Sequence, residues 1–230
     1  MGSKRIIVTG SSRGIGLALV KLLVSESHEV LALSRNTDSL KQLTPSNKNL
    51  HPLQADITDP KGLDTIVNFV NEKWGAVDIL VHNAGTLIHK PFKETTVADF
   101  IKVYQVNVFA VAELTRQLEQ FMTPGSHVVG ISSMGGIQGS MKFAGLSAYS
   151  SSKGALITLM ELLAEEYKER GIAFNTLALG AVQTEMLKEA FPDYQAPTTA
   201  AEMAEYIAEF SLNGNKLFNG KVLQVSNSTP

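Results

Sequence analysis

The chain has 230 residues, of which 44% are hydrophobic and 18% charged, as is typical of a globular protein with a substantial core. A formal net charge of −2, from 20 basic and 22 acidic residues, argues against nucleic acid or an anionic membrane surface as a partner. There is no cysteine, which excludes disulfides, thiolate metal sites and cysteine nucleophiles and fits a cytoplasmic location.

The chain lacks the signals of export, membrane insertion and metal binding. A strand-like segment follows within a few residues of Met1, so we expect no signal peptide. No stretch reaches the roughly 18 apolar residues of a membrane helix. The five histidines are scattered without metal-ligand spacing. We therefore expect a soluble protein without a metal site.

Short apolar runs bounded by turn residues alternate with longer helical patterns. This alternation predicts an α/β fold: a Rossmann-like, doubly wound parallel sheet of about seven strands with helices on both faces. The expected strands are Arg5–Thr9, Val30–Leu33, Leu50–Gln54, Ile79–His82, His127–Ser132, Ala173–Ala178 and Val222–Val225. The expected helices lie near Leu17–Val24, Lys61–Lys73, Thr96–Phe121, Ala148–Arg170 and Ala200–Phe210. The rhythm breaks only at about 184–198, which predicts a substrate loop within a single domain spanning 1–230.

A glycine-rich turn follows the first predicted strand, with the sequence Thr9-Gly10-Ser11-Ser12-Arg13-Gly14-Ile15-Gly16, and a helix begins directly after it. This arrangement collects backbone N–H groups and the positive end of a helix dipole, which together bind a pyrophosphate. The alternative is a tight turn that needs glycine for its geometry alone and binds no ligand. The strand before it and the helix after it favour dinucleotide binding instead.

The end of the second predicted strand bears on the choice of dinucleotide. NAD sites usually have an acidic residue about 20 positions downstream to hold the adenosine ribose. Here Arg35 occupies that region, and an arginine suits a 2′-phosphate as a bidentate, permanently charged partner. Arg13, in the glycine turn, is a second candidate cation. Surface arginines are common, but two that flank the ribose position predict NADP(H) rather than NAD(H).

Tyr149 and Lys153 open a predicted helix and lie four positions apart, on one face. Free tyrosine, with a pKa of about 10, is a poor acid–base at neutral pH. A nearby ammonium would lower that pKa and allow the pair to protonate a developing alkoxide, or to act in reverse. A lone Tyr-x-x-x-Lys pair is weak evidence, since it occurs by chance on many exposed helices.

Further motifs accompany these in order along the chain: Asp56, then His82-Asn83-Ala84-Gly85, Asn107 and Ile131-Ser132-Ser133. With them, the sequence resembles the short-chain dehydrogenase/reductase family, in its compact form, over nearly its whole length. The resemblance implies an NADP(H)-dependent oxidoreductase that transfers a hydride between the nicotinamide and a carbonyl or secondary alcohol. The order of the motifs makes chance agreement of all of them very unlikely.

The resemblance implies a set of cofactor-binding residues. Asp56 and Ile57 would lie against the adenine, the Asn83–Gly85 turn would border the adenosine, and Val182 with Thr184 would contact the carboxamide and phosphate. The complete expected set is Gly10, Ser12, Arg13, Gly14, Ile15, Gly16, Arg35, Asp56, Ile57, Asn83, Ala84, Gly85, Tyr149, Lys153, Val182 and Thr184.

The resemblance also implies the catalytic groups. Tyr149 would be the general acid/base, and Lys153 would tune it and bind the nicotinamide ribose. Ser133 would hold the substrate carbonyl oxygen. Ser132 competes for this role, but alternation along a strand lets only one of the two serines face the site. Asn107 would support a water chain to Lys153, although a buried asparagine bonded only to backbone stays open as the alternative.

Three departures from the family pattern stand out. His82 replaces the first asparagine of the usual Asn-Asn-Ala-Gly turn, which we expect to change a structural hydrogen bond rather than the chemistry. The segment before Tyr149 is longer than usual, with Met141-Lys142-Phe143 near the expected substrate mouth. Leu179-Gly180 stands where Pro-Gly is common, which we expect to loosen the turn beside the nicotinamide.

Two other functions compete with hydride transfer. A sugar-nucleotide epimerase shares the Tyr-x-x-x-Lys pair but carries a larger C-terminal substrate domain, for which little chain remains here. A regulatory protein that senses dinucleotide without turnover would have a broken catalytic set, whereas all four positions are filled. The resemblance also implies a homodimer or homotetramer, which packs the predicted helices Thr96–Phe121 and Ala148–Arg170 against a partner.

Overall fold

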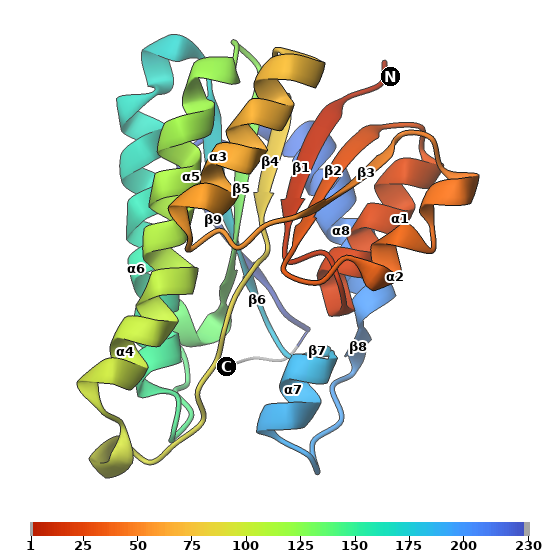
Figure 1. Cartoon of the computed structure of the whole chain (residues 1–230). Helices are drawn as coiled ribbons and strands as arrows, with labels where there is room; N and C mark the ends of the chain where they lie inside the picture. Colours follow the sequence, from red (N-terminus) through yellow and green to blue (C-terminus); the bar gives the residue numbers. More distant parts are fainter. Residues whose placement is uncertain (1, 228–230) are drawn as a thin grey trace.

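A computed structural model describes residues 2–227 of the chain, so the outermost ends of the predicted 1–230 domain lie outside the described residues. Seven parallel strands form one sheet in the order β3-β2-β1-β4-β5-β6-β9 (Figure 1). They are β1 (Arg5–Thr9), β2 (Glu29–Ser34), β3 (Leu50–Gln54), β4 (Ile79–His82), β5 (His127–Ser133), β6 (Ala173–Leu179) and β9 (Val222–Val225). The predicted Rossmann-like, doubly wound sheet is confirmed.

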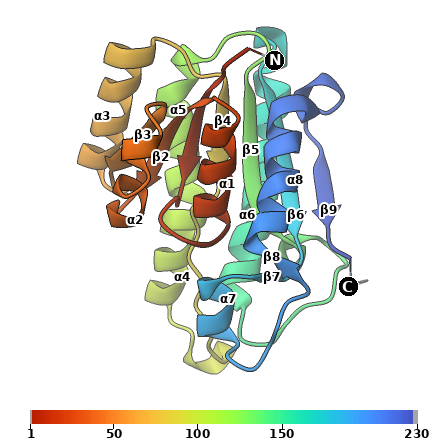
Figure 2. The same cartoon turned by 90° about the vertical axis from the view of Figure 1, so that its right-hand side faces the viewer.

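Helices cover both faces of the sheet (Figure 2). One face carries α1 (Gly14–Ser25) and α8 (Ala200–Asn213), and the other carries α3 (Pro60–Phe69), α5 (Ala110–Leu118) and α6 (Ser147–Glu166). The strand β1 is apolar at successive positions because both of its faces are covered. Ile6 and Val8 enter the core beneath α1 and α8, and Ile7 enters the core on the opposite face, all with no exposed surface.

Three features of the structure depart from the predicted elements. The predicted helix Thr96–Phe121 is divided by a π-helical turn, Gln105–Phe109, into α4 (Val97–Tyr104) and α5. The predicted substrate loop contains α7 (Glu185–Ala190), and it starts and ends in a short parallel pair, β7 (Val182–Gln183) with β8 (Thr198–Thr199). The four-residue helix α2 (Asp38–Lys41) was not predicted, because so short an element carries almost no periodic signal.

The strand order reverses between β1 and β4, whose partners are β2 on one side and β5 on the other. In open α/β sheets a crevice forms at this point, outside the carboxyl ends of the strands. The motifs singled out in the sequence follow the carboxyl ends of β1 to β6. The topology therefore brings them to one edge of the sheet.

Candidate functional site

The glycine turn after β1 is packed too closely for larger residues at two positions. Gly10 has a φ of +69°, and a Cβ there would lie 2.8 Å from the Ala84 Cα. At Gly16 a Cβ would lie 2.5 Å from the Asn83 Nδ2 and closer still to the Gly10 carbonyl oxygen. Gly10 and Gly16 are therefore required by the close packing of the turn against its neighbours.

Hydrogen bonds join the glycine turn to the turn after β4. The Asn83 Nδ2 donates to the carbonyl oxygens of Thr9 (2.9 Å) and Gly10 (3.1 Å). The Ala84 N–H donates to the Thr9 Oγ1 at 2.9 Å. These contacts bring together two predicted cofactor-binding segments, on either side of the crevice where the strand order reverses.

The N-terminus of α1 has the properties of an anion site. Its N-cap residue, Arg13, makes no side-chain capping bond, and the first turn of the helix contains no acidic residue. In contrast, α4 and α8 begin with complete capping boxes, Thr96 with Asp99 and Thr199 with Glu202. Free backbone N–H groups at a helix N-terminus suit a phosphate. The predicted residues Ser12, Gly14 and Ile15 lie in or directly before this first turn.

The predicted adenosine residues lie after β2 and β3. Arg35 is exposed. Burial acts to raise the pKa of the Asp56 carboxyl, but the backbone and side-chain hydrogen bonds from Thr58 outweigh it and hold that pKa below its ordinary value. The charge of Arg35 makes a smaller contribution in the same direction as Thr58. Ile57 is buried. The Ser39 hydroxyl donates to the Ser12 carbonyl oxygen at 2.8 Å, which ties the segment after Arg35 to the glycine turn.

Arg13 makes a contact that the sequence analysis did not foresee. Its guanidinium forms a forked ion pair with Glu189 on α7, at 2.5 and 3.3 Å. Both side chains are at least half exposed. No sequence signal relates these two positions, because they are 176 residues apart and an isolated glutamate on a short helix has no motif.

The reacting end lies where β5 meets α6. Tyr149 is in the first turn of α6, and its side chain lies beside that of Ser133 at the end of β5. Ser133 also accepts the Gly135 N–H at 3.2 Å. The preceding Ser132 is buried and donates to the Lys153 carbonyl oxygen at 2.9 Å. Of the two candidate serines, the structure places Ser133 at Tyr149.

Lys153 lies beneath Tyr149 and is almost fully buried. Its Nζ donates to the Ile131 carbonyl oxygen at 2.7 Å and lies 5.7 Å from the centre of the Tyr149 ring. Burial lowers the pKa of Lys153 to about 8. The expected lowering of the Tyr149 pKa by Lys153 is not found. Burial raises the pKa of Tyr149, and the neighbouring Ser133 side chain opposes this effect.

Asn107 lies in the π-helical turn between α4 and α5 and has no exposed surface. Its Oδ1 accepts the Thr86 N–H at 2.8 Å, and its Nδ2 donates to the Thr86 carbonyl (3.0 Å) and the Ser152 hydroxyl (2.9 Å). The side chain of Asn107 therefore joins the segment after Gly85 to α6. Sequence reasoning missed Thr86 and Ser152, which belong to no motif but complete this network.

The segment after β6 contains Val182 and Thr184, the last two predicted cofactor-binding residues. Val182 is buried in β7, and the Thr184 hydroxyl accepts the Leu187 N–H at 3.2 Å to cap α7. The expected loosening at Leu179-Gly180 is offset by β9, because the Gly180 N–H donates to the Val225 carbonyl at 2.9 Å.

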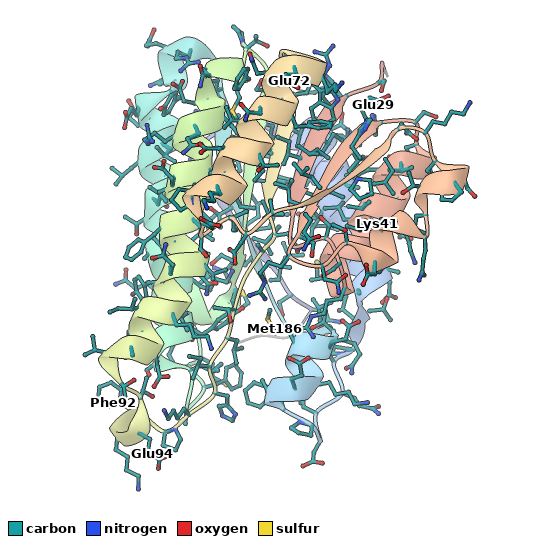
Figure 3. The ribbon with its side chains drawn as sticks, viewed as in Figure 1. Glu29, Lys41, Glu72, Phe92, Glu94 and Met186 are labelled. Atoms are coloured by element: carbon teal, nitrogen blue, oxygen red, sulfur yellow. The ribbon has the colours of Figure 1, made fainter. Side chains whose placement is uncertain are left out.

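Two side-chain contacts connect α7 to the segment after β4. The His89 Nδ1 donates to the Ala190 carbonyl at 3.0 Å, and the ring centres of His89 and Phe191 are 4.6 Å apart. Met186 projects from the end of α7 that faces the strands, whereas Phe92 lies at the foot of the α4 side (Figure 3).

Of the remaining departures from the family pattern, the one at His82 is accounted for by packing. His82 is buried, and its Nε2 lies 2.8 Å from the Thr115 Oγ1, so it links β4 to α5. Burial lowers its pKa to about 3, which keeps the ring neutral. Met141 and Phe143 are exposed.

A metal site and a membrane-spanning helix are both absent from residues 2–227. No group of three His, Asp or Glu side chains in this range could hold a metal ion. None of the helices described is both long enough and apolar enough to cross a membrane.

The fold and the placed residues define an α/β protein with a dinucleotide crevice next to a Ser–Tyr–Lys cluster. Residues 4–195 match the family model described as short chain dehydrogenase. The chain is 26% identical to a 3-oxoacyl-[acyl-carrier-protein] reductase of Salmonella typhimurium, over 97% of this chain and 96% of the relative. It is 30% identical to the gluconate 5-dehydrogenase of Gluconobacter oxydans, over 98% and 94% of the two chains.

A solved structure gives the same picture. A short chain dehydrogenase from Burkholderia cenocepacia, solved in complex with NADP, has a TM-score of 0.87 and is 28% identical, covering 98% of this chain and 97% of its own. The chain belongs to the short-chain dehydrogenase/reductase family, and it is an oxidoreductase of the class that acts on CH–OH groups.

Proposed function

We propose that the protein is an NADP(H)-dependent oxidoreductase that interconverts a carbonyl compound and a secondary alcohol, with Tyr149 as its general acid/base. The observation that carries the proposal is the cluster at the end of β5. The side chains of Tyr149 and Ser133 lie side by side, and the Lys153 ammonium lies 5.7 Å from the centre of the tyrosine ring. The dinucleotide, when bound, would supply or accept the hydride.

The three side chains have separate roles in this proposal. Ser133 donates a hydrogen bond to the substrate carbonyl oxygen, which develops negative charge as it is reduced. Tyr149 donates its proton to that oxygen, or removes the proton when the alcohol is oxidised. The buried Lys153 holds the ribose of the bound dinucleotide.

Asn107 is a positioning residue in this scheme. Both groups of its amide are bonded to Thr86 and Ser152, so its side chain joins two segments of the site. We propose that it supports proton supply to Lys153 indirectly, because it keeps α6 in register with the segment after Gly85.

The dinucleotide fits the chain's own residues. The uncapped N-terminus of α1, with a first turn free of acidic side chains, would hold the pyrophosphate. Arg35 and Arg13 would bind a 2′-phosphate, which supports NADP(H) over NAD(H). Asp56, Ile57 and the Asn83–Gly85 turn would border the adenosine, and Val182 with Thr184 the nicotinamide end.

The location and the assembly of the enzyme are also part of the proposal. We propose a cytoplasmic homodimer or homotetramer in which the helices α4, α5 and α6 meet a partner. Exposed apolar side chains on these helices support the interface: Val97, Ile101 and Leu162 are 76, 57 and 63% exposed. The substrate would be a small carbonyl compound or alcohol.

Turnover tests the proposal directly. NADPH oxidation is followed with a broad panel of ketones, aldehydes and oxoacyl thioesters, and binding of NADPH is measured in parallel. We expect oxidation with at least one class of carbonyl compound. Binding of NADPH without oxidation across the panel would favour a dinucleotide sensor and overturn the proposed reaction.

A further inference from the structure

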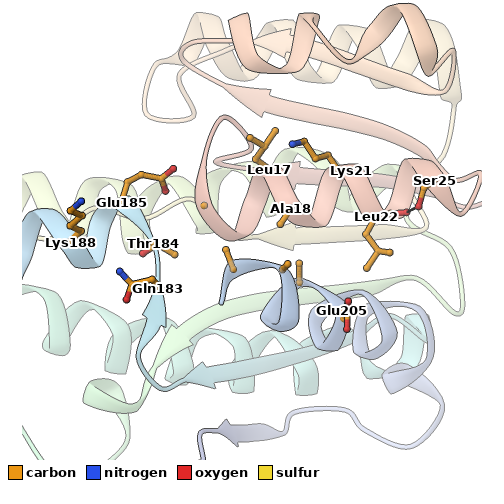
Figure 4. Close-up of a pocket in the computed structure, with 14 residues that line it drawn as sticks. Leu17, Ala18, Lys21, Leu22, Ser25, Gln183, Thr184, Glu185, Lys188 and Glu205 are labelled. Atoms are coloured by element: carbon orange, nitrogen blue, oxygen red, sulfur yellow. Dashed lines mark hydrogen bonds between the residues drawn. The ribbon is translucent and has the colours of Figure 1, made fainter. Parts of the chain in front are cut away.

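The short helix α7 is held by few contacts. None of its six residues is buried, and a cavity of about 710 Å³ separates it from α1 and α8. Figure 4 shows Glu185 and Lys188 of α7 at one end of this cavity, which continues along Leu17, Ala18 and Leu22 of α1. An element with so little buried apolar surface has a low local stability. Its position therefore depends on individual polar contacts.

The main polar contact of α7 with the glycine turn is the ion pair between Glu189 and Arg13. Two guanidinium nitrogens, Nη1 and Nη2, face the two carboxylate oxygens at 2.5 and 3.3 Å. A forked pair of this kind uses the edge of the guanidinium that would also serve a phosphate. Arg13 cannot present that edge to Glu189 and to a second anion at once.

We propose that Glu189 sets cofactor specificity by competing with the adenosine 2′-phosphate for Arg13, so that NADP(H) releases α7 from the glycine turn whereas NAD(H) leaves it attached. The inference rests on the proposed function, because it takes the dinucleotide site at the glycine turn as given. Its new element is the residue on α7 that opposes the phosphate.

The charges around Arg13 support a competition rather than a shared site. The Glu189 hydrogen bond raises the pKa of Arg13, and the charges of Glu189 and Glu185 act in the same direction. Both carboxylates belong to α7. A 2′-phosphate at Arg13 would bring a further negative charge toward them, so the phosphate and these two carboxylates repel each other. Movement of α7 away from the glycine turn relieves this repulsion.

The first test compares Glu189→Gln with wild-type protein in binding NADPH and NADH by calorimetry at constant ionic strength. An exposed ion pair is weak, so we expect NADPH to bind about two- to fivefold tighter to the variant, with NADH changed by less than about 1.5-fold. The matched control is Glu205→Gln, which removes a carboxylate that lines the same cavity from α8 and should leave the ratio unchanged. An equal gain for both dinucleotides would overturn the proposal.

A double-mutant cycle tests whether the effect passes through Arg13. In an Arg13→Met background, Glu189→Gln should no longer alter the ratio of NADPH to NADH affinity. If the ratio still shifts in that background, Glu189 acts through its general field and the proposed competition is wrong. This readout does not require turnover, so it is independent of which substrate the enzyme reduces.

The release of α7 is measured with a fragment of the cofactor. Adenosine 2′-monophosphate carries the discriminating phosphate without the nicotinamide half, and adenosine 5′-monophosphate is its isomer. At saturation, the first should accelerate amide hydrogen exchange at residues 185–190 and the second should not. Equal exchange with both nucleotides bound would overturn the release of α7.

The two levels of proposal fail in different ways. If neither NADPH nor NADH binds the wild-type protein, the proposed function fails and this inference fails with it. If both bind and Glu189→Gln leaves their ratio unchanged, the proposed function stands and only the role of Glu189 is rejected.

Discussion

The side chain of Ser133 lies beside that of Tyr149 and acts to lower the pKa of the phenol. The two residues come from adjacent elements, the last position of β5 and the first turn of α6. Side chains alternate along a strand, so Ser132 faces the other way and bonds to the backbone of α6 instead. One serine is thereby placed at the proposed reaction site while its neighbour fixes the helix that carries Tyr149.

Replacement of Tyr149 by Phe removes only the phenolic hydroxyl. General acid–base groups contribute about 10²- to 10⁴-fold to rate, so we expect kcat to fall at least about 100-fold. The affinity for NADPH should stay within about twofold, because the ring and Lys153 remain. Steady-state kinetics and fluorescence titration of NADPH measure the two quantities. A Tyr149→Phe enzyme with more than about a tenth of the wild-type kcat would contradict the assignment.

The two neighbouring serines should respond in opposite ways to alanine substitution. Ser133→Ala removes a donor to the carbonyl oxygen, and losses of about 10²- to 10³-fold in kcat are typical of such donors. Ser132→Ala instead removes a buried hydrogen bond to the Lys153 carbonyl, which should lower the free energy of unfolding by about 1 kcal/mol. Kinetics and urea unfolding of both variants check this. The prediction fails if Ser132→Ala has the larger kinetic effect and the smaller effect on stability.

The sheet was predictable because its inner strands are continuous apolar runs covered on both faces, as Ile6, Ile7 and Val8 show. The breaks in the helices were not. A π-helical turn such as Gln105–Phe109 keeps the apolar periodicity on either side, so the sequence pattern predicts one helix. The helix α7 was missed because none of its six residues is fully buried, and a buried apolar face is the signal on which such predictions depend.

The residues of the candidate site were predictable as a set, since each follows the carboxyl end of a parallel strand or lies on the next helix. Their electrostatics were not. The pKa of Tyr149 depends on how deeply the ring is buried, and a spacing of four residues contains no information about burial. The pairing of Arg13 with Glu189 joins distant parts of the chain, and only the fold reveals it.

Arg35 should discriminate between the two dinucleotides. It is exposed and follows β2 directly, where a charge-assisted hydrogen bond to a 2′-phosphate contributes about 1.5–3 kcal/mol. We therefore expect Arg35→Ala to weaken NADPH binding by roughly 10- to 100-fold and NADH binding by less than about twofold. Calorimetric titration measures both.

A matched control for Arg35 removes an arginine far from the cofactor site. Arg116 is exposed on α5 and pairs with Glu113, so Arg116→Ala should change neither affinity. If Arg35→Ala weakens NADPH and NADH equally, Arg35 does not read the 2′-phosphate, and the preference for NADP(H) would have to rest on Arg13 alone.

Stability should fall in acid because of buried neutral histidines, and His82 gives the sharpest case. Its folded pKa of about 3 lies below the ordinary 6.5, so the unfolded chain binds more protons between these values. Its contribution to stability is therefore complete above about pH 6.5 and is lost as the pH falls toward 3. The loss amounts to about 1.4 kcal/mol per pH unit. His127, with a pKa lowered to about 4, and His28 add to the same slope.

The variant His82→Asn isolates the contribution of this one ring, because His127 and His28 remain in both proteins. We expect the free energy of unfolding of the variant, measured with urea between about pH 5 and 6, to depend less on pH than that of the wild type, by about 1.4 kcal/mol per pH unit. The comparison uses slopes, so an overall loss of stability from the changed contact with Thr115 does not affect it. Parallel profiles for the two proteins would mean that His82 is protonated equally in the folded and unfolded chains, against its buried position between β4 and α5.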